Sequence, residues 1–121
     1  PLVNRGNVLA FQERWDEAAA DYRRALERDP GEAAAMNNLA WVLLQSGRGG
    51  EGEGWARRAV AARPEEPAFW DTLAEIQLTG GDPDGARQAA EQGLALEPPP
   101  ELRLALESKR AQAMKYPQPR Q

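Results

Sequence analysis

The chain has 121 residues, 28% of them charged, and it contains neither cysteine nor histidine. Their absence excludes disulfide frameworks and thiol chemistry, the commonest metal ligand, and the side chain best suited to proton transfer near neutral pH. Residues 101–121 hold five basic and two acidic side chains and so carry a charge of +3. The net charge is −4, so the first 100 residues carry −7. An acidic body argues against nucleic acid, whose binding depends on basic groups that neutralise phosphates.

Apolar residues spaced three and four apart, with prolines between them, predict seven helices. We expect them near residues 2–12, 14–28, 33–46, 51–62, 67–79, 83–96 and 101–114. Four glycines fall within 49–54, and each interior glycine costs a helix about 1 kcal/mol relative to alanine. Residues 49–53 are therefore expected to be a frayed or late-starting turn. No apolar run approaches the roughly 18–20 residues that span a bilayer, so we expect no membrane insertion. Residues 115–121 are expected to form a flexible tail.

Similar residues recur every 34 positions along the chain. The repeated columns are large and apolar (Leu2, Met36, Trp70, Leu104), small (Gly6, Ala40, Ala74; Ala18, Gly52, Ala86; Ala25, Ala59, Gly93), branched (Leu26, Val60, Leu94; Val8, Val42, Ile76) and proline (Pro30, Pro64, Pro98). Small residues let paired helices approach closely, and each proline ends a helix because it cannot continue the hydrogen-bond ladder. Seven columns in one register predict three tandem helix–turn–helix units.

This pattern resembles the tetratricopeptide repeat (TPR) family, whose 34-residue unit is matched best by Trp70, Leu73, Ala74, Ala86 and Pro98. The resemblance implies an all-α fold, a right-handed α-solenoid of three units at about 1–32, 33–66 and 67–100. Residues 101–114 would form a capping helix and complete a TPR domain over 1–114. The chain departs from the motif at Arg5, where the family has a buried leucine.

The resemblance also implies a concave groove, lined by the first helix of each repeat, that binds a peptide or protein segment. By register, the candidate groove residues are Asn7, Phe11, Asn37, Asn38, Trp41, Gln45, Asp71 and Glu75. Amide side chains can satisfy a peptide backbone, and tryptophan is a strong interface anchor. A ligand with an apolar residue for Trp41 and a basic one for the Asp71/Glu75 patch would suit this surface. The alternative is that these polar groups are simply solvated and that Trp41 packs within its helix pair.

Chaperone-binding members of the family clamp a C-terminal carboxylate with lysine, arginine and asparagine. The two asparagine positions are present as Asn7 and Asn38, but the three basic positions hold Val3, Ala68 and Thr72. Charge-assisted bonds to a carboxylate are then missing. We therefore expect no binding to acidic chaperone tails.

Catalysis is the least supported reading. Asp71 and Glu75 are the nearest approach to a catalytic carboxylate pair, yet no histidine, nucleophile or phosphate-binding loop accompanies them. A metal site built from carboxylates would need more ligands. We expect a protein that is not an enzyme and that needs neither a cofactor nor a metal.

The second functional reading is a structural unit that self-associates into homo-oligomers. Leu2 and Leu9 lie at the N-terminal edge with no preceding repeat to cover them, and we read Pro1 as the edge of a longer protein. At the other end, charged residues face outward while Leu102, Leu104 and Leu106 are expected to reach the third repeat. The arginine-rich, alanine-rich composition suggests a bacterial source, and cytoplasm and periplasm remain equally open as locations.

Overall fold

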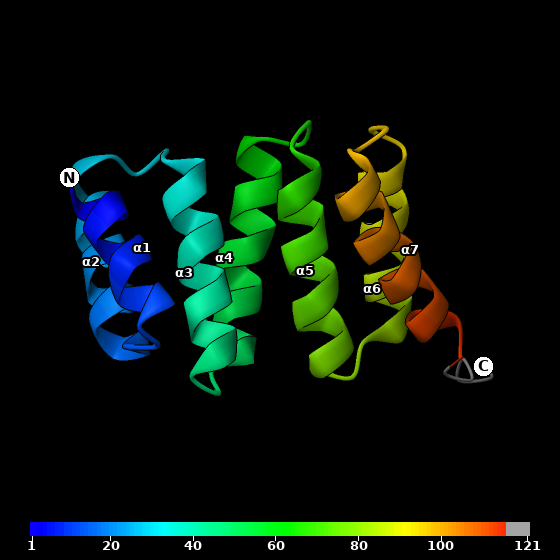
Figure 1. The fold of residues 1–121 in the computed structure, drawn as a ribbon, viewed down its shortest axis with the longest axis horizontal. Coiled ribbons are helices and arrows are strands. Elements are labelled where there is room, and N and C mark those ends of the chain that lie inside the picture. Colours follow the sequence, from blue (N-terminus) through cyan, green and yellow to red (C-terminus); the bar gives the residue numbers. More distant parts are fainter. Residues whose placement is uncertain (116–121) are drawn as a thin grey trace. The chain divides into compact units, whose positions relative to one another are not determined.

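The computed structural model describes residues 1–115, and within them the regular secondary structure is entirely α-helical (Figure 1). The helices are α1 (Leu2–Phe11), α2 (Trp15–Arg28), α3 (Ala33–Gln45), α4 (Gly49–Ala62), α5 (Pro67–Thr79), α6 (Pro83–Leu94) and α7 (Pro100–Met114). The predicted all-α fold is therefore confirmed. Lys115 follows the last helix, and the remainder of the tail predicted at 115–121 lies outside the described residues. Across residues 1–115, none of the helices combines the length and the apolar character that a bilayer crossing requires.

The chain divides into two compact units, residues 1–63 and 64–121. In the first unit, α1 packs on α2, α2 on α3, and α3 on α4. Its centre is formed by side chains that are almost completely buried, among them Tyr22, Leu39, Val42 and Leu43. Gly6 lets α1 approach this centre, because a Cβ at that position would lie 2.6 Å from Tyr22 Cε1.

The glycines of the second repeat do not delay its second helix, so the expectation of a frayed turn at 49–53 is wrong. Helix α4 begins at Gly49. Gly52 is buried against α3, where a Cβ would come within 2.9 Å of the Ala40 carbonyl oxygen. The close crossing of α3 and α4 requires a residue without a side chain at this point, and packing outweighs the low intrinsic helix propensity of glycine.

A further 34-residue column marks the turn between the helices of each pair. Gly47 and Gly81 have φ angles of +82° and +80°, and Glu13 holds the same left-handed conformation with φ +58°. Glycine adopts this conformation freely, whereas a Cβ clashes with the neighbouring carbonyl. The first repeat therefore carries backbone strain at a position where the other two have relieved it.

In the second unit, α5 packs on α6 and α7 packs on both. Leu106 of α7 is completely buried, and a Cβ at Gly93 of α6 would lie 3.0 Å from its methyl groups. Leu104, which we expected to reach the third repeat, is instead 64% exposed. Leu106 and Leu104 are two residues apart, which places them on opposite sides of a helix with about 3.6 residues per turn. At the N-terminal end of this unit, the indole Nε1 of Trp70 donates a 2.8 Å hydrogen bond to the Pro64 carbonyl.

Candidate functional site

Three polar side chains meet where α1, α2 and α3 approach one another. The Tyr22 hydroxyl donates a 2.6 Å hydrogen bond to Asn7 Oδ1, and Asn38 Nδ2 donates a second, 3.0 Å bond to the same oxygen. These two bonds fix the Asn7 amide and direct its Nδ2 group away from its two partners. Asn7 and Asn38, which register assigns to the groove, are in direct contact.

Two large aromatic side chains extend this surface by one helical turn. Phe11 follows Asn7 by four residues on α1 and is 90% exposed; Trp41 follows Asn38 by three residues on α3 and is 42% exposed. Residues three and four apart are neighbours on one helix face. Gln45, four residues beyond Trp41, is also exposed. Trp41 therefore presents a substantial part of its ring to solvent, unlike the fully buried side chains of the same helix.

Asn37 is less available than the sequence suggested. Its Oδ1 atom is shielded from solvent and has no hydrogen-bond partner among the described residues. A buried acceptor without a donor is uncommon and unfavourable. In this conformation Asn37 does not offer its carbonyl oxygen to a ligand, and Asn38 supplies the amide contact of α3.

The acidic patch on α5 is partly neutralised within the chain, because one lysine faces its two carboxylates. Lys109 of α7 places its Nζ 2.8 Å from Asp71 Oδ1 and 3.9 Å from Glu75 Oε1, and the lysine side chain is only 15% exposed. A basic residue of a ligand would have to compete with this ion pair. The sequence repeat could have predicted this ion pair, because Lys109 follows Glu75 by 34 positions and so occupies the same column.

The carboxylate-clamp positions carry no cation in the structure either. Thr72 is 9% exposed, and its Oγ1 donates a 3.2 Å hydrogen bond to the Ala68 carbonyl. Its hydroxyl thus serves the α5 backbone rather than a ligand. Over residues 1–115, no group of three or more acidic side chains is arranged to hold a metal ion.

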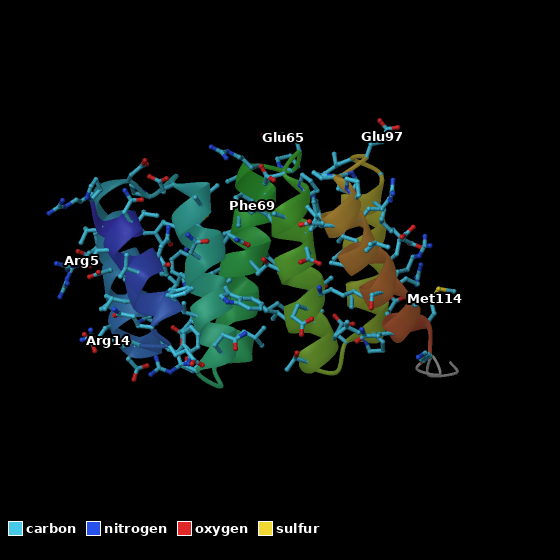
Figure 2. The ribbon with its side chains drawn as sticks, in the orientation of Figure 1. Arg5, Arg14, Glu65, Phe69, Glu97 and Met114 are labelled. Carbon is cyan, nitrogen blue, oxygen red and sulfur yellow. The ribbon has the colours of Figure 1, made fainter. Side chains whose placement is uncertain are left out.

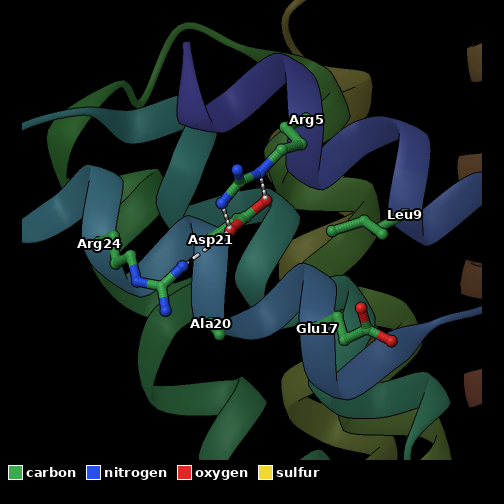
Figure 3. A pocket seen from close by; sticks show the side chains of 6 residues that line it. All are labelled: Arg5, Leu9, Glu17, Ala20, Asp21 and Arg24. Carbon is green, nitrogen blue, oxygen red and sulfur yellow. Dashed lines mark hydrogen bonds and ion pairs between the residues drawn. The ribbon is translucent and has the colours of Figure 1, made fainter.

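A second polar feature lies on the other side of α1, and sequence reasoning anticipated only half of it. Arg5 Nε and Nη2 each donate a 2.7 Å hydrogen bond to the carboxylate of Asp21, and Arg24 Nη1 lies 3.3 Å from the same carboxylate (Figure 3). Asp21 is 2% exposed, whereas most of the Arg5 side chain is in solvent. The hydrogen bonds from Arg5 hold the pKa of Asp21 below its ordinary value of 3.8, although burial opposes this shift.

This ion pair borders an open pocket of about 370 Å³ between α1 and α2. Its walls are formed by Arg5, Leu9, Glu17, Ala20, Asp21 and Arg24 (Figure 3). Glu17 is bound in turn by Arg14, whose Nη2 lies 2.6 Å from Glu17 Oε2. Arg5 and Arg14 both lie on the outer side of the first helix pair (Figure 2). The pocket therefore opens on a charged surface distinct from the face that carries Asn7.

Comparison with known proteins decides the family. A tetratricopeptide repeat profile matches residues 3–67, and a second tetratricopeptide repeat profile matches residues 67–92. The chain belongs to the tetratricopeptide repeat family. The resemblance inferred from the 34-residue columns is confirmed.

This TPR chain is 37% identical over 72 residues to one relative, the protein O-mannosyl-transferase Tmtc2 of Drosophila melanogaster. The match covers 59% of this chain and 8% of that protein. The chain is also 30% identical over 96 residues to human tetratricopeptide repeat protein 7B, covering 79% and 11% respectively. The chain thus spans only about a tenth of the length of these relatives, so their activities do not transfer with the match.

Solved structures show the same fold at low sequence identity. The type III secretion translocator chaperone SycD of Yersinia enterocolitica superposes with a TM-score of 0.88 at 14% identity, over 94% of this chain and 81% of that one. The Sgt2 TPR domain of Aspergillus fumigatus superposes with a TM-score of 0.85 at 22% identity, over 94% of this chain and 78% of that one. The first TPR domain of Spaghetti (RPAP3), solved with an HSP90 peptide, superposes with a TM-score of 0.83 at 22% identity, over 95% of this chain and 91% of that one.

Proposed function

We propose that this TPR chain is a protein-interaction module that binds a peptide or protein segment on the face formed by α1 and α3. The observation that carries the proposal is the pair of exposed aromatic rings, Phe11 and Trp41, one turn along from the hydrogen-bonded Asn7 and Asn38. Aromatic anchors beside oriented amides combine apolar contact with donors for a peptide backbone.

Other TPR structures support this use of the fold. Spaghetti (RPAP3) is solved with the HSP90 peptide SRMEEVD, PcrH with the chaperone-binding region of PopD, and SycD with a peptide of the translocator YopD. Binding of a protein segment is common to these complexes, although the segments differ. We extend to this chain the class of partner only, and we propose no catalytic activity and no cofactor.

The chemistry of the ligand follows from the groups on the α1–α3 face. Both acceptor interactions of Asn7 Oδ1 are made within the protein, so Asn7 contributes its Nδ2 donor, which suits a backbone carbonyl. Phe11 and Trp41 suit an apolar side chain. In the second unit, Asp71 and Glu75 are held by Lys109, so we assign them a weaker part than the sequence suggested.

The bacterial source is proposed from composition, and the peptide or protein partner from the groove residues. A partner can be found without knowing the source. Peptides selected from a random phage-displayed library on the immobilised chain would be synthesised, and their affinities measured by isothermal titration calorimetry.

The decisive variants are Trp41→Ala and Asn38→Ala. Each is expected to weaken binding of the selected peptides by about tenfold or more, as loss of an interface anchor does. Trp55→Ala is the matched control, because Trp55 lies on α4 beneath Arg58 and outside the proposed face. Unchanged affinity in both Trp41→Ala and Asn38→Ala would remove the proposal.

The HSP90 peptide SRMEEVD provides a complementary test. We expect it not to bind, because Val3, Ala68 and Thr72 supply no cation for its terminal carboxylate. Binding of SRMEEVD that depends on Asn7 and Asn38 would show that this chain can hold a terminal carboxylate without cations at the three clamp positions.

A further inference from the structure

The outer face of the first helix pair differs from the equivalent faces of the later repeats. Where the first repeat has the Arg5–Asp21 ion pair, the same columns hold apolar residues in the others, namely Leu39 with Trp55 and Leu73 with Ala89. Leu39 and Leu73 are buried, whereas most of the Arg5 side chain is in solvent, so only the first helix pair carries an exposed ion pair in these columns. Two arginines share the carboxylate of Asp21 at the pocket between α1 and α2, and Glu17 adds a second carboxylate to its walls.

The exposed side of α2 is self-complementary in charge, because an acidic residue on one side of its centre is matched by a basic residue on the other. Glu17 and Arg24 stand at equal distances on either side of the midpoint between Ala20 and Asp21. A two-fold axis through that midpoint, perpendicular to the helix, sets two copies of α2 antiparallel. Glu17 of each copy then lies level with Arg24 of the other, and the small Ala20 stands near the axis, where it allows close approach. An isologous interface requires this kind of self-complementary surface.

A second pair of charges flanks the same midpoint in the sequence, with Glu13 in the turn before α2 and Arg28 as the last residue of the helix. Glu13 and Arg28 are again equidistant from the midpoint, and both are exposed. Glu13 keeps a left-handed backbone conformation in which the other repeats have glycine. Strained residues persist where the surroundings or a function favour the side chain.

The other repeats do not offer the same surface. In α4 the equivalent residues are Glu51 and Arg58, and they have partners within the chain, as Glu17 and Arg24 do in α2. The outer pair is absent from α4, because the columns of Glu13 and Arg28 hold Gly47 and Ala62. In α6 the same columns hold Gly85 and Gln92. Within the part of the chain that the structure describes, only α2 carries the complete pattern.

We propose that two copies of this chain associate through their α2 helices in antiparallel orientation, with reciprocal Glu17–Arg24 ion pairs across the two-fold axis. The partner's Glu17 approaches the pocket where Arg5 and Arg24 share the carboxylate of Asp21. Leu9 and Ala20, both partly exposed in the single chain, are covered by the second copy.

The charges set the orientation of this dimer more than its strength. Exposed ion pairs contribute little affinity and are screened by salt, whereas complementary charge fixes register and excludes wrong pairings. The apolar contribution is limited to small areas around Leu9 and Ala20. We therefore expect a reversible monomer–dimer equilibrium that shifts toward monomer as ionic strength rises.

This inference is independent of the proposed peptide-binding face. Arg5 and Leu9 lie on the opposite side of α1 from Asn7 and Phe11, since positions two apart differ by about 200° around a helix. Peptide affinity and self-association can thus fail separately, and each is measured by a different experiment.

Sedimentation equilibrium over a range of protein concentrations tests the proposal. Arg24→Glu and Glu17→Arg each place like charges opposite one another twice, and each is expected to weaken the dimer by about tenfold or more. The double variant Glu17→Arg/Arg24→Glu exchanges the two charges and is expected to restore association. Rescue by the exchange cannot come from a general loss of structure.

Two further variants complete the experiment. Arg58→Glu makes the same charge change in the equivalent column of α4 and is expected to leave the equilibrium unchanged. Ala20→Arg introduces a long side chain at the axis and is expected to abolish the dimer even if a charge variant proves poorly folded by circular dichroism. A wild-type chain that is monomeric at every concentration overturns the proposal. So does a dimer that is insensitive to Arg24→Glu and Ala20→Arg, or a double variant that stays monomeric.

Discussion

The Tyr22 hydroxyl donates a 2.6 Å hydrogen bond to Asn7 Oδ1, which links the buried centre of the first unit to the face where we place ligand contacts. Tyr22 is 1% exposed, and its ring lies against Gly6. Burial, with a smaller contribution from the charge of Asp21, raises the pKa of Tyr22 to about 12. Its protonation state is therefore coupled to the structure of the α1–α3 face.

Tyr22 should make stability depend on alkaline pH. Its pKa is higher in the folded chain than its ordinary value of 10.0, so its contribution to stability is complete below pH 10 and is lost as the pH rises toward about 12. Absorbance titration at the tyrosinate band, taken as the difference between wild type and Tyr22→Phe, should show late ionisation. Ionisation near pH 10 in a chain that still shows helical circular dichroism would contradict this expectation.

Two glycines of α4 should respond oppositely to alanine. At Gly52 the new Cβ would lie 2.9 Å from a backbone oxygen of α3, which cannot move aside, so we expect a loss of about 1–3 kcal/mol in the free energy of unfolding. At Gly54 no atom lies within 4 Å of a Cβ, so alanine should stabilise the helix by up to about 1 kcal/mol. Urea denaturation of the two variants checks both signs. Similar effects from both would show that propensity, not the α3–α4 crossing, governs this helix.

Replacement of Glu13 by glycine should separate folding from association. Relief of the positive φ angle is expected to raise the free energy of unfolding by about 1 kcal/mol. The same change removes a charge from the proposed α2 interface, so the dimer should weaken while the monomer becomes more stable. Thermal unfolding at low protein concentration measures the first effect and sedimentation the second. No gain in stability would mean that the left-handed turn is not strained.

Asp21 should account for part of the acid sensitivity of the chain. Its pKa is lower in the folded chain than its ordinary value of 3.8, so its contribution is present above that pH and is lost as the pH falls through the folded-state pKa. Asp21→Asn should therefore flatten the fall in stability at acid pH. Asp16→Asn, which removes an exposed carboxylate from the same helix, is the control. Equal slopes in wild type and Asp21→Asn would exclude this role.

Much of the fold could be predicted because the repeat ties many residues to one register. The predicted helices differ from the observed ones by one or two residues at their ends, and the family follows from the same columns. The two wrong predictions, at Gly52 and Leu104, concern how a residue packs against a neighbouring helix. Gly52 belongs to a column of small residues at the helix crossing, but the low helix propensity of glycine was given more weight than this packing role. Leu104 was grouped with Leu106, although the two face opposite ways.

The contacts of the candidate site were harder to predict for a similar reason. Register assigned Asn7 and Asn38 to the groove but did not predict the hydrogen bond between them. Lys109 could have been paired with the acidic patch from its 34-residue spacing to Glu75. Arg5 stood out as a departure from the motif, but its partner Asp21 is 16 residues away and follows no repeat interval. The exposure of Trp41 depends on how α1 and α3 approach each other, which no single-helix pattern specifies.

The position of Trp70 gives the chain a built-in optical reporter. Of its four tryptophans, three precede residue 64, and Trp70 alone belongs to the second unit, where its indole is tied to the Pro64 carbonyl. Arrays of repeats can open one section at a time, because each section contacts only its neighbours. With Trp15, Trp41 and Trp55 replaced by phenylalanine, fluorescence would report the second unit by itself. Comparison with circular dichroism, which sees every helix, would then show whether the chain melts in one step or two.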